Sequence, residues 1–268
     1  MKKLITILLA VLCLTACGGK DDDKTITVIA TPEPHSSILE QCKPLLAEKG
    51  YELEIIVVDD YYTPNKSLDM DEADANYFQH VPFFNGEVET NGYDIAIAAY
   101  IHIEPFGFYS KTIKDQSELK DGDRIIISNS VADHGRILAI LDKAGILKLK
   151  EGADPQTATL DDVVENPLNL VFEQVNPEML TSTYENEDNV ALVAINGNYA
   201  IGAGLNPTKD AVILEQADET NPYVNIVACR TEDLNSDKIN ALVEVMKSDT
   251  IKNYITETYA DGSVIPAN

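Results

Sequence analysis

The chain has 268 residues, 44% of them hydrophobic, which is enough to bury a sizeable core and suits two lobes of about 100 residues or more. Its formal net charge of −25, from 45 acidic and 20 basic residues, excludes nucleic acid and anionic lipid headgroups as partners because like charges repel. The four cysteines do not make a disulfide framework. We interpret Cys42 and Cys229 as small buried apolar residues, with a bridge between them as the alternative.

The first 24 residues predict a membrane anchor. Two lysines precede the apolar stretch Leu4–Leu14, which is too short to span a bilayer. The residues Leu14-Thr15-Ala16-Cys17 then resemble a bacterial lipobox, so we expect a signal peptide over residues 1–16 and a lipid on Cys17. A diacylglyceryl group supplies two chains, enough for stable anchoring, and the polar residues 17–24 predict a flexible tether. We therefore expect the protein to be lipid-anchored on the extracytoplasmic face of the cell membrane.

The segment after the tether predicts a βαβ unit. Thr25–Ala30 is an apolar, β-branched run that is typical of a strand. A helix should begin at Ser36 or Ser37 and end at Lys49 before Gly50, and Leu53–Val58 reads as the next strand. Such a unit implies a parallel sheet with helices on its faces.

Ala73–Phe84 is a segment unusually rich in aromatic residues, and it fits neither the helical nor the strand period. We predict that a strand ends at Asp74–Ala75 and that a turn or helix start then presents Tyr77, Phe78 and His80 at an edge. Rings with polar tips suit a pocket for a small amphiphile. An aromatic plug in the core is the alternative.

Asp94–Glu104 alternates between polar and apolar residues, which predicts a strand with Tyr100, His102 and Glu104 on one face. Residues 105–110 break the pattern, as a crossing between lobes would. We expect one lobe to comprise residues 25–108 and 224–268, and the second, inserted lobe to comprise residues 109–223.

The rest of the chain predicts a second α/β lobe and the return to the first. We expect strands at Arg124–Ser128, Asn169–Val175, Val190–Ile195 and Tyr223–Cys229, and helices at His134–Ala144, from about Gly197 onward, at Ser236–Lys247 and at Asp249–Tyr259. Ligands of open α/β sheets bind at the loops that leave the carboxyl ends of strands, so a cleft between the lobes is the expected binding site.

Three polar residues stand where such a cleft is expected. Arg136 lies in the first turn of a predicted helix and could bind a carboxylate with its fork, a solvated surface arginine being the alternative. Asn196 follows a predicted strand and could bind both ends of a zwitterion, although the pair Asn-Gly is also typical of an ordinary turn. Asn225 interrupts an apolar strand and needs a hydrogen-bond partner.

Several segments together resemble the NlpA family, the methionine-binding lipoproteins that feed an ABC importer. They read T-P-E-P-H, D-A-N-Y-F-Q-H-V-P, H-I-E-P-F-G-F-Y-S-K, I-N-G-N-Y-A and N-P-Y-V-N-I, and the resemblance extends over nearly all of residues 25–266. It implies a type II periplasmic-binding-protein fold that closes over one amino acid. It also implies a monomer without cofactor or enzymatic activity that delivers methionine to permease and ATPase subunits.

The resemblance also assigns roles to residues. Arg136 resembles the family's carboxylate clamp, and Asn196 and Asn225 resemble its polar contacts to the amino-acid head group. A further set resembles the wall around the thioether, where sulfur meets aromatic rings favourably, and it consists of Tyr77, Phe78, His80 and His102.

One segment departs from the family pattern. Members usually carry P-T-N-x-x-R before the arginine, whereas this chain has V-A-D-H-G-R over Val131–Arg136. The carboxylate of Asp133 would grip an ammonium but oppose a carboxylate. The ligand is therefore left open among L-methionine, D-methionine, a methionine dipeptide and another amino acid.

Two other functions compete with methionine capture. Four histidines and Glu104 could be drawn as a zinc-type site of an ABC importer's metal-binding lipoprotein, which metal analysis would reveal; they are His35, His80, His102 and His134. The second competing function is that of a surface lipoprotein without a transport role. Genes for a permease and an ATPase beside the gene for this protein would argue against it. No nucleophile–base arrangement typical of an enzyme is legible.

Overall fold

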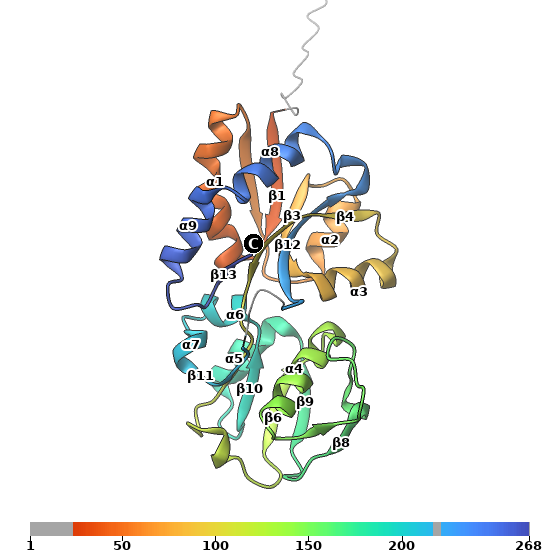
Figure 1. Cartoon of the computed structure of the whole chain (residues 1–268), viewed down its shortest axis with the longest axis vertical. Helices are drawn as coiled ribbons and strands as arrows, with labels where there is room; N and C mark the ends of the chain where they lie inside the picture. The colour runs from red at the N-terminus through yellow and green to blue at the C-terminus, as the bar shows by residue number, and fades with distance from the viewer. Residues whose placement is uncertain (1–23, 217–220, 268) are drawn as a thin grey trace, which may run out of the picture.

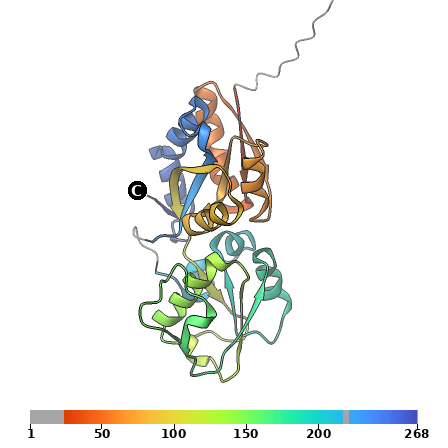
Figure 2. The ribbon, with the colours of Figure 1, turned by 90° about the vertical axis from the view of Figure 1, so that its right-hand side faces the viewer.

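The computed structural model describes residues 24–216 and 221–267, and it forms two α/β lobes stacked along the long axis of the molecule (Figures 1 and 2). The predicted signal peptide, Cys17 and most of the tether lie outside the described residues. Within the described part of the chain, no helix is long and apolar enough to cross a membrane.

The first lobe contains a six-stranded sheet in the order β13-β4-β12-β3-β1-β2. The strands are β1 (Thr25–Ala30), β2 (Glu52–Val57), β3 (Ala75–His80), β4 (Ile95–Ile103), β12 (Val224–Arg230) and β13 (Ile265–Pro266). The predicted βαβ unit is confirmed, since β1 runs parallel to β2. One face is covered by α1 (Ser37–Glu48), α8 (Asp237–Met246) and α9 (Asp249–Thr258), and the other by α2 (Thr63–Asp69) and α3 (Val81–Asn91) (Figure 1).

The second lobe is built on a five-stranded sheet in the order β11-β5-β10-β6-β9. These strands are β5 (Gly107–Tyr109), β6 (Arg124–Ser128), β9 (Val171–Val175), β10 (Leu192–Ile195) and β11 (Ala211–Leu214). One face packs against α4 (Val131–Lys143), and the other against α5 (Leu180–Asn186) and α6 (Gly197–Gly202). Because the central strands are buried on both faces, they read as continuous apolar runs.

Short elements complete the fold. They are the helical turns η1 (Pro32–Ser36), η2 (Gln116–Glu118), η3 (Leu160–Asp162), η4 (Pro177–Met179) and η5 (Thr231–Asp233), the helix α7 (Pro207–Asp210), and the paired strands β7 (Lys148–Leu149) and β8 (Val163–Glu165). The cysteines Cys42 and Cys229 are buried and free in the core of the first lobe, as the apolar interpretation predicted.

The chain crosses between the lobes twice. Strand β4 belongs to the first sheet and β5 to the second, so the first crossing spans residues 104–106, just before the expected boundary at residue 108. The chain returns between β11 and β12. The second lobe is thus an insertion in the first.

The prediction that a strand ends at Asp74–Ala75 is wrong. Strand β3 continues to His80, paired with β1 on one side and β12 on the other, and all six of its residues are buried. With both faces covered, no alternation is left for a sequence pattern to reveal. Helix α3 begins directly afterwards, and its second residue Pro82 is tolerated because the first turn needs no backbone donor.

The prediction that Tyr100, His102 and Glu104 share one face of β4 is also wrong. Tyr100 is 49% exposed, whereas His102 is completely buried. On the partner strand, Ile226 lies opposite Tyr100 and the adjacent Asn225 lies opposite His102, so Ile101 is an extra residue that forms a bulge. A bulge shifts every later side chain relative to the sheet. It brings His102 and Glu104 into the interior.

Candidate functional site

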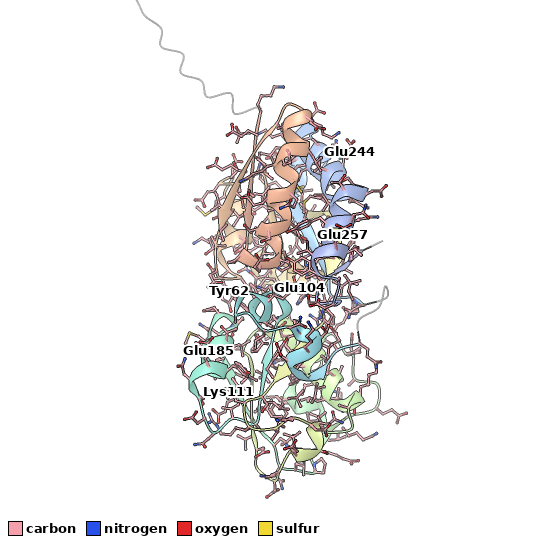
Figure 3. All side chains as sticks on the ribbon, turned by 90° about the vertical axis from the view of Figure 1, so that its left-hand side faces the viewer. Tyr62, Glu104, Lys111, Glu185, Glu244 and Glu257 are labelled. Atoms are coloured by element: carbon pink, nitrogen blue, oxygen red, sulfur yellow. The ribbon has the colours of Figure 1, made fainter. Side chains whose placement is uncertain are left out.

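A nearly closed cavity lies between the two lobes. Its open space of about 20 Å³ holds roughly one water molecule, so an amino acid can enter only when the lobes move apart. Two hydrogen bonds close it from opposite lobes: the hydroxyl of Tyr61 donates to Asn198 Oδ1 at 2.6 Å, and the hydroxyl of Tyr199 donates to the carbonyl of Asp59 at 3.1 Å. Glu104 lies where the lobes meet (Figure 3).

Most of the predicted site residues line this cavity. They are Phe78, His80, Arg136, Asn196 and Asn225. Tyr77 and His102 do not line it. Successive strand residues point to opposite faces, so Tyr77 enters the core beneath α1 while Phe78 faces the second lobe. Sequence reasoning missed four lining residues, Tyr61, Gln79, Phe83 and Asn198, of which Asn198 stands in the quoted I-N-G-N-Y-A segment.

Aromatic rings form the apolar wall of the cavity. The ring centroid of Tyr61 lies 5.7 Å from that of Phe83 and 5.0 Å from that of Tyr199, and Phe78 lies 5.9 Å from Phe83. Tyr61 comes from the loop between β2 and α2, and Phe83 from the first turn of α3. Ring edges of this kind suit an apolar side chain that contains sulfur.

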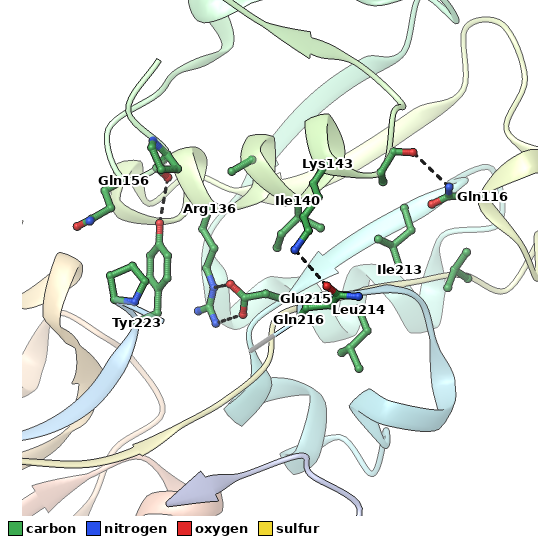
Figure 4. A pocket seen from close by; sticks show the side chains of 15 residues that line it. Gln116, Arg136, Ile140, Lys143, Gln156, Ile213, Leu214, Glu215, Gln216 and Tyr223 are labelled. Atoms are coloured by element: carbon green, nitrogen blue, oxygen red, sulfur yellow. Dashed lines mark hydrogen bonds and ion pairs between the residues drawn. The ribbon is translucent and has the colours of Figure 1, made fainter. Parts of the chain in front are cut away.

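Arg136 is held by a carboxylate of the protein. Helix α4 begins at Val131, before the predicted start, so Arg136 lies in its second turn rather than its first. Its Nε and Nη2 donate to the two Glu215 oxygens at 3.0 and 2.6 Å (Figure 4). Nη2 also donates to the Glu104 carbonyl at 2.7 Å. At 4% exposure, Arg136 is not the solvated arginine considered as the alternative. Burial alone would lower its pKa, but the Glu215 charge outweighs burial and raises the pKa above the ordinary value.

The outer side of this ion pair borders an open surface pocket of about 510 Å³. The ring centroid of Tyr223 lies 4.3 Å from the guanidinium carbon of Arg136, and Lys143 Nζ donates to Gln216 Oε1 at 3.2 Å (Figure 4). Both cationic side chains are thus engaged within the protein. In the described residues Arg136 Nη1 makes no hydrogen bond, so one arm of the guanidinium remains available.

Asp133 is the second carboxylate that lines the cavity, beside Glu104. Its Oδ1 accepts from Asn196 Nδ2 at 3.1 Å and lies 3.6 Å from His80 Nε2, which belongs to the other lobe. Burial alone would raise the pKa of Asp133, but His80, Ser128 and Arg136 hold that pKa below its ordinary value. Asp133 therefore stays ionised at neutral pH.

A buried hydrogen-bond network supports the cavity from the first lobe. His102 bridges the hydroxyl of Tyr77, 2.5 Å from its Nδ1, and Glu104 Oε1, 2.7 Å from its Nε2. His35 Nε2 lies 3.0 Å from Asn225 Oδ1. With Asn225 Oδ1 bound to His35, its amide nitrogen is left to donate to a ligand. Tyr77 and His102 thus position Glu104, which is a different place from the thioether wall expected of them.

This network contains part of the metal site considered from the sequence. His35, His102 and Glu104 place one potential ligand atom each within 4.8 Å of one another. His134 does not join them, because its Nε2 bonds to the carbonyl of Ser128 at 2.9 Å. His35 Nδ1 is likewise bonded to the hydroxyl of Thr31 at 2.9 Å. The imidazoles of His35 and His102 are therefore already bonded through both ring nitrogens.

Acid should destabilise the protein through these two histidines. Burial lowers the pKa of His35 from 6.5 to about 4 and that of His102 to about 3. The unfolded chain therefore binds more protons than the folded one below about pH 6.5, and stability should fall until the pH reaches the folded values. The loss attributable to His35 alone is of order 3 kcal/mol. Urea unfolding at about pH 7 and pH 5 measures the part of this loss that falls between those two values, about 2 kcal/mol. A His102→Gln variant should lose less stability over this range, and equal pH slopes would contradict the prediction.

Gly197 allows the two lobes to approach at Glu104. A Cβ on Gly197 would lie 2.6 Å from the Cβ of Glu104, closer than real contacts allow. We expect Gly197→Ala to reduce the free energy of unfolding by about 1–3 kcal/mol. Gly202 ends the same helix with no atom within 4 Å of an added Cβ, so Gly202→Ala is the matched control and should be neutral or slightly stabilising. Chemical denaturation compares the two, and equal stabilities would show that the contact relaxes at no cost.

The chain is similar to known proteins over nearly its whole length. A model of the NlpA lipoprotein family matches residues 26–268. The methionine-binding lipoprotein MetQ of Bacillus subtilis is 46% identical over 96% of this chain and 93% of its own length.

Solved structures give the same result. A putative methionine-binding lipoprotein from Bacillus subtilis superposes with a TM-score of 0.88 at 46% identity, over 92% of this chain and 99% of the other. A nutrient-binding protein from Burkholderia cenocepacia, bound to methionine, gives 0.84 at 32% identity over 91% and 100%. An ABC-transporter periplasmic substrate-binding protein from Coxiella burnetii gives 0.83 at 33% identity over 90% and 100%. The predicted type II periplasmic-binding-protein fold is confirmed.

Proposed function

This chain belongs to the NlpA lipoprotein family, and we propose that it captures methionine outside the cytoplasm and delivers it to an ABC importer. The observation that carries the proposal is the cavity between the lobes, which joins an aromatic wall to an arginine, an aspartate and several amides. An amino acid with an apolar, sulfur-containing side chain matches both halves. The relatives' names point to the same ligand.

In the proposed orientation, the ligand carboxylate meets Arg136 and the amide nitrogen of Asn225. The thioether lies against Phe78 and the neighbouring rings of Tyr61 and Phe83, and His80 closes the cavity beside Asp133. Charge-assisted hydrogen bonds dominate such a site, because a carboxylate that leaves water needs a cation or several donors.

The location and partners follow from the same family membership. Lipoprotein relatives support a membrane-anchored, extracytoplasmic protein, and we propose that Cys17 carries the anchor. A permease and an ATPase would be the receiving subunits. Since one chain supplies all the walls of the cavity, a monomer suffices for capture.

We propose that the protein binds its ligand without catalysing a reaction. The relatives are named for binding. Burial raises the pKa of Cys42 to about 12 and that of Cys229 to about 11, so neither thiol is a reactive thiolate near neutral pH.

Mass spectrometry of the small molecules released by denaturing the purified protein tests the ligand, and metal analysis of the same sample tests the zinc-type alternative. We expect methionine in near-stoichiometric amount and metal well below it. Stoichiometric zinc without an amino acid would favour the metal-binding function instead.

A further inference from the structure

Two buried acceptors in the cavity lack donors. Asp133 is 2% exposed and Asn196 is 6% exposed, and both line the cavity. Within residues 24–216 and 221–267, Asp133 Oδ2 and Asn196 Oδ1 have no hydrogen-bond partner. Buried polar atoms are nearly always paired in native proteins. Two such atoms on adjacent side chains indicate a donor that comes from outside the chain.

The fold places these two atoms together. Strands β6 and β10 are parallel neighbours, so their carboxyl ends lie at the same edge of the sheet. Asp133 lies in the first turn of α4 after β6, and Asn196 is the N-cap residue of α6 after β10. Their side chains are joined by the hydrogen bond from Asn196 Nδ2 to Asp133 Oδ1. That bond holds the two side chains beside each other at the cavity, and one oxygen of each is left without a donor in the described residues.

The buried charges around the cavity favour a cation. Asp133 and Glu104 line the cavity together with one arginine, Arg136, and Glu215 on the outer side of Arg136 already accepts from two of its nitrogens. Burial raises the pKa of Glu104 and so favours its neutral form, and Arg136 is paired with Glu215, so the side chain that faces Asp133 Oδ1 is His80, whose Nε2 lies 3.6 Å away. An uncompensated buried charge is costly, and a bound cation would remove that cost.

We propose that Asp133 Oδ2 and Asn196 Oδ1 bind the α-ammonium group of the ligand, and that this ammonium decides which methionine-like molecules the cavity accepts. The inference rests on the proposed function and adds the ligand group that it requires. An ammonium has three donors and a positive charge, so it satisfies both acceptors and balances Asp133. In a 2-hydroxy acid of the same shape, a hydroxyl group with one donor and no charge replaces the ammonium. It would leave one acceptor unpaired and Asp133 unbalanced.

Calorimetry on ligand-stripped protein, with L-methionine and 2-hydroxy-4-(methylthio)butanoate as the two probes, tests the inference. Wild type should bind methionine at least about 100-fold more tightly than the hydroxy acid. Asp133→Asn keeps the shape and an oxygen that accepts from Asn196. It should lose about 10- to 100-fold in methionine affinity, whereas the hydroxy acid should bind as well as or better than it does to wild type, because the unbalanced charge is gone. Asp161→Asn, at an exposed position of the same lobe, is the control and should change neither affinity.

The outcomes separate the inference from the proposed function. If wild type binds both probes equally, or if Asp133→Asn binds methionine more tightly, the ammonium assignment is wrong and methionine capture stands. If wild type binds neither probe, the proposed function falls and the inference falls with it. The comparison of probes on wild type decides the matter even if Asp133→Asn does not fold.

Discussion

Arg136→Ala should weaken methionine binding by about 3–5 kcal/mol, because the ligand's carboxylate would be buried without a cation. At tenfold per 1.4 kcal/mol, this is a loss of roughly two to three and a half decades in affinity. The guanidinium of Arg136 serves two partners in this account: Nε and Nη2 donate to Glu215, and Nη1 donates to the ligand carboxylate. Arg136→Lys should recover only part of the loss, because an ammonium lacks the planar fork. Titration calorimetry measures each variant.

The same substitution should also destabilise the fold, because Glu215 would lose its partner in a largely buried position. Denaturant unfolding of each variant is therefore a necessary companion to the titration. Asn225→Ala serves as a comparison and should weaken binding less, since a neutral hydrogen bond contributes less than a charge-assisted one. If a folded Arg136→Ala variant binds methionine as tightly as wild type, the carboxylate lies elsewhere and the proposed orientation is wrong.

Cys17→Ala should abolish lipidation and block cleavage of the signal peptide. The thiol of Cys17 is the attachment point that the lipobox offers for the two acyl chains, and an alanine has no group that can carry them. Metabolic labelling with a radioactive fatty acid should mark wild type and leave the variant unlabelled. Cys42→Ala is the matched control and should keep the label, because Cys42 is buried in the first lobe. A labelled Cys17→Ala variant would disprove the anchor site.

The regular elements could be predicted because their signals are local. Strand β6 matches its predicted range, and the starts of α8 and α9 lie where Ser236 and Ser248 cap them by accepting from backbone N–H groups. Prediction failed where pairing between distant strands decides the outcome. Strand β3 is hidden because both of its faces are covered, and the bulge at Ile101 depends on how β4 pairs with β12.

The residues of the candidate site also fall into those that the sequence could predict and those that it could not. Residues inside the distinctive segments, such as Phe78 and Asn196, could be named from the sequence. Tyr61 and Glu215 could not, because their roles depend on contacts with Asn198 and Arg136, which lie 137 and 79 residues away in the sequence. Asp133 was noticed as unusual, but only the structure shows that one of its oxygens lacks a partner in the described part of the chain.

Titration of ligand-stripped wild-type protein with L-methionine, and then with norleucine, tests the central claim most directly. We expect saturable one-to-one binding of methionine. Norleucine, in which a methylene replaces sulfur, should bind more weakly by about 0.3–1.5 kcal/mol for each lost contact between sulfur and a ring. No saturable binding of methionine to folded, ligand-free protein would contradict the claim.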